Sequence, residues 1–156
     1  YIATREAQRL SARCLRLQRK RIPMIAQPRS LVLPVTKALT TSLQQWIDKS
    51  AIDTANGVVI NYRDPDYSAK YGGYHPVEVA INQNGALLYI TDFAYAGHPP
   101  FAELAKEIDF DFSCQLFQHY GIDHPLIRGK ALYKLWQSNF CAYYKQRVYQ
   151  TEVTSL

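Results

Sequence analysis

Two histidines, His75 and His98, each lie next to a proline in loops that flank predicted central strands. A histidine held by a carboxylate can act as a general acid or base near neutral pH. The carboxylates available to such a cluster are Asp64, Asp66 and Asp92. The sequence contains no GxSxG, HExxH or Cys–His signature that would supply a nucleophile or a catalytic metal. These residues therefore define a hypothetical hydrolase site that lacks a recognisable nucleophile.

A row of acidic residues alternates along one predicted strand, at Glu107, Asp109 and Asp111. Together with Asp92 and Glu78 on neighbouring strands, this row has the oxygen ligands that divalent cations prefer. Metal sites of this kind usually gather their ligands at strand ends or in loops, and the sequence has no DxDxDG loop. We therefore interpret the row as the solvated outer face of a sheet.

A second group of ligand types falls within eleven positions: Cys114, His119, Asp123 and His124. Structural zinc sites normally pair two short clips such as CxxC or HxxxH, and neither spacing occurs here. The Gly72–Gly73 pair leads into a strand, whereas phosphate-binding loops lead into a helix N-terminus. We therefore predict neither a metal nor a cofactor.

A tyrosine-rich loop is the strongest candidate for molecular recognition. Tyrosine offers a large contact area with few rotamers to freeze, and its hydroxyl adds a polar contact. The alternative is that some of these rings only cover the core of the sheet. The predicted recognition surface consists of Tyr62, Tyr67, Tyr71, Tyr74 and His75.

The net charge of +5 arises from the first residues of the chain. Residues 1–23 carry seven basic groups and one acid (+6), and residues 24–156 carry eleven basic and twelve acidic groups (−1). Nucleic-acid binding is therefore expected only through this segment. Residues 1–23 have three other interpretations: a basic helix, a transit peptide, or sequence upstream of a true start at the only methionine, Met24. The candidate nucleic-acid arm consists of Arg5, Arg9, Arg13, Arg16, Arg19, Lys20 and Arg21.

The elements that would position these residues follow from hydrophobic periodicity. Helices are predicted from Pro34 to about Lys49 and over Arg128–Arg147. Glu103–Glu107 suits a helical turn, and Gly121–Pro125 a loop. Because the connections are too short for parallel crossovers, the strands must be antiparallel. The strands are predicted at Gly57–Tyr62, Tyr74–Ile81, Ala86–Tyr95, Glu107–Phe112, Gln115–Tyr120 and Arg147–Thr154.

The pattern predicts an α+β domain at residues 31–156 behind a basic leader at residues 1–30. We expect a twisted antiparallel sheet of about five to seven strands, flanked by N- and C-terminal helices. No apolar run approaches the length of a membrane helix. Three widely spaced cysteines argue against a disulfide framework and favour a reducing compartment, so a cytoplasmic location is expected.

Four segments resemble, in order, an uncharacterised bacterial family of unknown function that is frequent in marine gamma-proteobacteria and on genomic islands. They are Arg63–Val79 (RDPDYSAKYGGYHPVEV), Tyr89–Gly97 (YITDFAYAG), Glu103–Phe112 (ELAKEIDFDF) and Leu135–Phe140 (LWQSNF). The resemblance extends over about residues 31–153. Members are similar in fold to the mitochondrial matrix glycoprotein family. The mitochondrial proteins are acidic, ring-shaped trimers that bind many partners, including complement, so the resemblance implies a role in protein interaction. The near-neutral body of this chain departs from that acidity, and the family supplies no catalytic residues.

These observations favour a non-enzymatic protein-interaction domain that self-associates, with an unidentified protein partner and no contact with a membrane. Two alternatives belong to other classes. One is a nucleic-acid-binding or anti-defence accessory protein of mobile DNA that uses the basic leader. The other is a cryptic hydrolase built on His75, His98 and nearby carboxylates.

Overall fold

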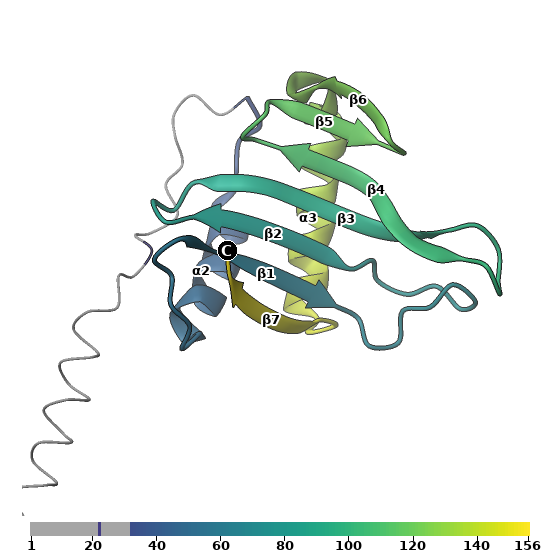
Figure 1. The fold of residues 1–156 in the computed structure, drawn as a ribbon, viewed down its shortest axis with the longest axis horizontal. Helices are drawn as coiled ribbons and strands as arrows, with labels where there is room; N and C mark the ends of the chain where they lie inside the picture. Colours follow the sequence, from purple (N-terminus) through teal and green to yellow (C-terminus); the bar gives the residue numbers. More distant parts are fainter. Residues whose placement is uncertain (1–21, 23–31) are drawn as a thin grey trace, which may run out of the picture.

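The computed structural model describes Ile22 and residues 32–156. The basic leader and its arginines therefore lie outside the described residues, apart from Ile22, which is buried in the core. Two helices and seven strands follow one another in this described part of the chain, with a short 3-10 helix before the second helix (Figure 1). They are α2 (Lys37–Lys49), β1 (Gly57–Arg63), β2 (Val77–Asn82), β3 (Leu87–Ala96), β4 (Glu103–Asp111), β5 (Leu116–His119), β6 (Ile122–Pro125), η1 (Leu126–Gly129), α3 (Lys130–Lys145) and β7 (Gln150–Ser155).

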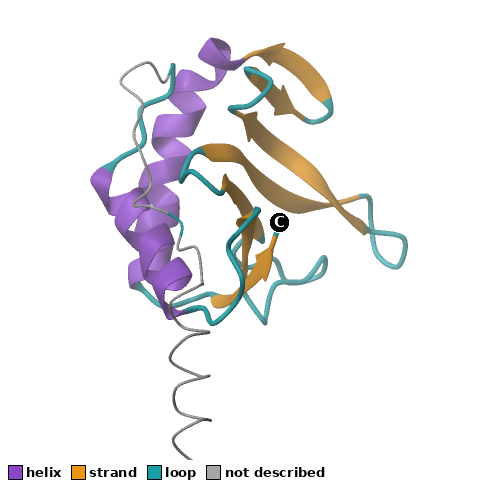
Figure 2. Ribbon diagram, turned by 60° about the vertical axis from the view of Figure 1, so that its left-hand side comes forward, coloured by secondary structure: helices purple, strands orange, loops and turns teal. Residues whose placement is uncertain are grey.

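The strands form one sheet in the order β6-β5-β4-β3-β2-β1-β7, and every neighbouring pair is antiparallel. β3 lies at the centre, as expected for a strand that is apolar on both faces. Both helices lie on the same side of the sheet (Figure 2). The predicted α+β fold, with an antiparallel sheet flanked by N- and C-terminal helices, is confirmed.

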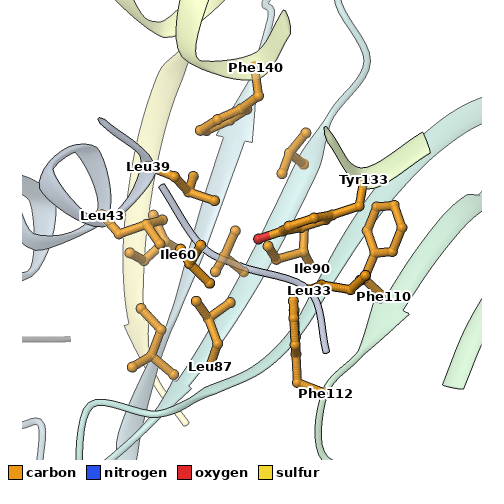
Figure 3. Packing of buried hydrophobic residues seen from close by; sticks show 14 of the residues in the cluster. Leu33, Leu39, Leu43, Ile60, Leu87, Ile90, Phe110, Phe112, Tyr133 and Phe140 are labelled. Carbon is orange, nitrogen blue, oxygen red and sulfur yellow. The ribbon is translucent and has the colours of Figure 1, made fainter. Parts of the chain in front are cut away.

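The core lies between this helical layer and the inner face of the sheet. Alternate residues of β1 and β2 point inward and are buried, while α2 contributes Leu39 and Leu43. Aromatic rings fill the half of the core under α3, where the Phe110 and Tyr133 rings meet edge to face at 5.0 Å (Figure 3). Burial of such side chains contributes about 1.5–3 kcal/mol each.

Two segments differ from their predicted structure. Residues 103–107 begin β4 and are not a helical turn, because residues 103–106 pair with the end of β3 from Ala96 to Phe93. Residues 122–125 form strand β6, not a loop. Tyr120 and Gly121 both have positive φ angles (49° and 78°), which makes the two-residue turn of a tight hairpin.

The β3–β4 ladder contains a bulge at the point that matters for the site. Asp92 pairs with Ile108 and Phe93 pairs with Lys106, so Glu107 is an extra residue with no partner on β3. Such a bulge changes the direction in which the side chains of a strand point.

No helix in the described part of the chain is long and apolar enough to cross a membrane.

Candidate functional site

His75, Asp92 and Glu107 form a compact cluster where the start of β2 meets β3 and β4. The Nδ1 atom of His75 lies 2.7 Å from Oδ1 of Asp92 and 3.1 Å from Oε2 of Glu107. The second oxygen of each carboxylate also has a donor. Trp136 on α3 donates its indole N–H to Oδ2 of Asp92 at 2.9 Å, and the Tyr120 hydroxyl donates to Oε1 of Glu107 at 2.6 Å.

Each member of the cluster comes from a different element. His75 lies in the loop two residues before β2, and Asp92 is an inward-facing residue of β3 that is only 8% exposed. Glu107 joins them because of the bulge in β4, which brings Glu107 and its neighbour Ile108 to line the same pocket. The prediction that Glu107 lies on the outer face is therefore wrong. Strict alternation would have placed it there, and the bulge breaks the alternation.

The remaining acidic residues of that row lie on the outer face, where they are only partly solvated: the Asp109 side chain is 14% exposed. Asp109 accepts hydrogen bonds from Thr91 and Lys106, and Asp111 accepts one from Ser113. These contacts belong to the sheet face opposite the helices. Glu78 accepts a bond from the Tyr89 hydroxyl on a neighbouring strand at 2.8 Å.

The cluster forms part of the wall of a pocket of about 360 Å³ between α3 and the sheet. This size falls within the range of about 300–1,000 Å³ that is usual for ligand pockets. The other walls are mainly apolar and aromatic, and the described lining contains no lysine or arginine. These walls include Tyr74, Val77, Ile108, Leu132, Leu135, Trp136, Phe140, Tyr143 and Tyr149.

A hydrogen-bonded loop between β1 and β2 supplies one side of the pocket. Asp64 organises this loop, because its carboxylate accepts the backbone N–H groups of Asp66 at 3.0 Å and Tyr74 at 2.9 Å. Gly73 has a φ of +131°, and a Cβ atom there would lie 2.8 Å from the Asp64 carboxylate. Tyr67 ties the loop to β3, since its hydroxyl accepts the N–H of Tyr95 and the two rings stack.

The residues of the predicted recognition surface separate into three environments. Tyr62 is fully buried and packs edge to face on Phe140, so its assignment to an exposed surface is wrong. Val58, Ile60 and Tyr62 are alternate residues of β1, so their side chains point to the same, inner face of the sheet. Tyr71 is 80% exposed. The remaining three residues, Tyr67, Tyr74 and His75, are half-buried. Tyr74 and His75 line the pocket, and the ring of Tyr67 packs beside His75.

The predicted acid–base cluster is assembled only in part. His75 and Asp92 are in direct contact, whereas the hydrogen bonds of Asp64 go to its own loop. His98 lies in the turn between β3 and β4, where its carbonyl accepts the N–H of Phe101. No serine, threonine or cysteine lines the described pocket, so these walls supply no hydroxyl or thiol of the usual nucleophilic types.

The electrostatics of the cluster favour a protonated His75. Its hydrogen bond to Asp92 raises the pKa of the imidazole above 6.5; burial opposes this rise, and the charges of Asp92 and Glu107 reinforce it. Burial, followed by the charge of Asp92, raises the pKa of Tyr149. The pocket is therefore an electronegative environment in which two carboxylates face one imidazole.

The other predicted ligand types do not converge within the described chain. Asp123 accepts a bond from Gln118, while His119 and His124 pack against the ring of Phe117. Cys114 is exposed. Among the described residues, only His75, Asp92 and Glu107 bring three possible metal ligands together, with ligand atoms within 4.8 Å of one another.

Comparisons with known proteins match this chain to relatives whose function is unknown. Residues 37–154 match the family described as "Protein of unknown function (DUF2787)". A hypothetical protein from the VSP-II pathogenicity island of Vibrio cholerae is 39% identical, with a TM-score of 0.70 over 79% of this chain and 95% of that one.

A conserved hypothetical protein from pathogenicity island VPI-2 of the same species is 35% identical. The TM-score is 0.69 over 81% of this chain and 98% of that one, and this neighbour is described as sharing structural homology with the human P32 protein. No curated protein matches. The predicted resemblance, including its association with genomic islands and the mitochondrial glycoprotein fold, is confirmed.

Proposed function

The chain belongs to the DUF2787 family, whose function is unknown. We propose that this member is a protein-interaction domain that binds its partner in the pocket beside His75. The observation that carries this proposal is the combination, in one pocket, of aromatic walls and two hydrogen-bonded carboxylates, of which Asp92 is buried. Protein interfaces place most of their binding energy in a few such desolvated pockets.

The margin of the pocket suits a protein ligand. Leu135 lines it and is 58% exposed, and Tyr120, which is bonded to Glu107, is 68% exposed. Apolar and aromatic side chains that remain in solvent beside a pocket gain free energy when a partner covers them. The likeness of a neighbouring structure to P32 supports an interaction role in general and names no partner for this chain.

Site-specific photo-cross-linking tests the proposal. We would replace Leu135 with p-benzoylphenylalanine and irradiate cells of the source organism. Ile127 is the matched control, because it is a similar apolar side chain with 53% exposure outside the pocket lining. We expect a discrete cross-linked protein from position 135 and none from position 127. Equal labelling at both positions, or none at 135, would contradict a partner in this pocket.

The proposal extends to self-association. β6 and β7 are the two edges of the sheet, and edge strands present unpaired backbone groups that favour pairing with other chains. Light scattering at increasing concentration measures this property directly. We expect a mass greater than that of one chain, and a concentration-independent monomer would remove this part of the proposal.

A further inference from the structure

We propose that the pocket beside His75 binds the guanidinium group of an arginine side chain from the protein partner. This inference rests on the proposed function and names the chemistry of the contact. It follows from the charge of the cluster, from the unused acceptors of its two carboxylates and from the aromatic walls around them.

Charge favours a cationic guest. Asp92 and Glu107 contribute two negative charges, and His75 contributes at most one positive charge. The carboxylates are largely withdrawn from solvent, with side chains 11% and 18% exposed. Screening by water is weaker in such a place, so a complementary charge is attracted more strongly than at an open surface.

The two carboxylates retain capacity for more donors. An ionised carboxylate offers about four acceptor positions. Asp92 uses one on each oxygen for His75 and Trp136. Glu107 uses one for Tyr120, and its other oxygen lies 3.1 Å from the same Nδ1 atom of His75. Guanidinium carries five N–H donors in a planar arrangement that pairs well with carboxylates.

The walls suit the rest of an arginine side chain. Tyr74 and Tyr143 meet edge to face with their centroids 4.7 Å apart, and Tyr149 lies beside Tyr74 at 6.4 Å. Guanidinium groups stack on such rings and gain a cation–π attraction of about 0.5–2 kcal/mol. Leu132 and Leu135 line the same pocket, where the aliphatic stem of an arginine would pack against apolar surface.

A divalent metal fits this site less well. The same Nδ1 atom of His75 faces both carboxylates and is hydrogen-bonded to Asp92, so a metal there would have to displace the proton of that bond. A volume of about 360 Å³ with aromatic walls also exceeds what a coordinated ion needs. We therefore treat metal binding as a competing outcome of the test.

A matched pair of ligands tests the inference on the full chain. N-acetylarginine methylamide and N-acetylcitrulline methylamide have nearly the same shape, but only the first is charged. Affinity would be measured by NMR from the ring signals of His75, with His124, which does not line the pocket, as the internal control. We expect arginine to bind at least about tenfold more tightly than citrulline, with shifts at His75 and none at His124.

The variant Glu107→Gln keeps the size of the side chain and removes one charge. We expect it to weaken arginine binding about tenfold and to leave citrulline binding unchanged. Equal affinity of the two ligands for the wild-type chain would overturn the inference. Micromolar binding of Zn²⁺ or Mn²⁺ that shifts His75 would overturn it in favour of a metal site.

The two proposals fail in different ways. A partner that cross-links at position 135, together with equal affinity for arginine and citrulline, leaves the interaction domain intact and removes only the arginine contact. Absence of any cross-link at 135 removes the proposed function, whatever the small ligands do.

Discussion

At the scale of single residues, the site depends on a buried carboxylate whose partners come from distant parts of the chain. Asp92 is 8% exposed and is held by His75 and Trp136. An unpaired buried charge costs several kcal/mol, so these two donors make the position of Asp92 tolerable. The paired carboxylate then sets the protonation state of His75.

We predict that His75 titrates above 6.5 in an NMR pH titration. Asp92 on β3 and Glu107 on β4 are the charged groups that face its ring, and Tyr67 of the loop lies 5.4 Å away between ring centroids. In Asp92→Asn the main hydrogen bond to a charge is lost, so the His75 pKa should fall. An unchanged pKa in that variant would contradict the pairing.

The same pairing predicts how stability depends on pH. The pKa of His75 is higher in the folded chain than in the unfolded chain. Its contribution to the free energy of unfolding is therefore fully present below pH 6.5. The contribution is lost as the pH rises through the raised pKa. Urea unfolding of the wild type and of His75→Gln should therefore differ most near pH 5.5 and least near pH 9. A difference that grows with pH would have the wrong sign.

Two tryptophans provide a matched test of the bond to Asp92. Trp136→Phe removes the donor to a buried charge, which should cost about 1.5–3 kcal/mol of unfolding free energy in addition to the lost packing. Trp46→Phe removes a buried indole N–H that has no hydrogen-bond partner in the described structure. Its cost should be clearly smaller in the same urea titration, and equal costs would show that the bond contributes little.

At the scale of elements, the bulge in β4 and the loop before β2 bring the cluster together. The bulge turns Glu107 inward, and the loop presents Tyr74 and His75 to the pocket. Gly73 and Asp64 determine the shape of the loop, because a side chain at Gly73 would collide with the Asp64 carboxylate.

We predict that Gly73→Ala disrupts the pocket and Gly72→Ala does not. Gly72 also has a positive φ (+71°), but no atom lies within 4 Å of its hypothetical Cβ, so alanine there should cost only about 1 kcal/mol. Gly73→Ala adds a steric clash at φ +131° and should cost more. Thermal unfolding gives the stability, and the NMR signals of His75 report the pocket. Similar effects of both variants would contradict this account of the loop.

These elements also mark the limit of prediction from the sequence. The β-branched and aromatic pattern of β1 correctly placed this strand, but its alternation should also have placed Tyr62 in the core. His75 and Asp92 were predicted as partners from their residue types. Glu107 was assigned to the outer face and its contact with His75 was missed, because a bulge depends on the register between two strands and leaves no local signal in either one.

At the scale of the whole molecule, the two sides of the sheet have different roles. The inner face packs on α2 and α3 (Figures 1 and 2). It also contains the pocket, while the outer face carries polar pairs such as Thr91–Asp109 and Tyr89–Glu78. The order of helices and strands was sufficient to predict this α+β architecture. A partner could not be predicted, because the pocket exists only once distant segments have packed together.

The measurement that tests the central claim most directly is an NMR titration of the chain with the partner protein that the cross-linking experiment identifies. The chain has two tryptophans, and only the indole N–H of Trp136 belongs to the pocket. We predict that the Trp136 indole signal shifts on binding and that the Trp46 signal remains in place. Saturable binding that leaves the Trp136 signal unmoved would contradict the claim that this pocket is the binding site.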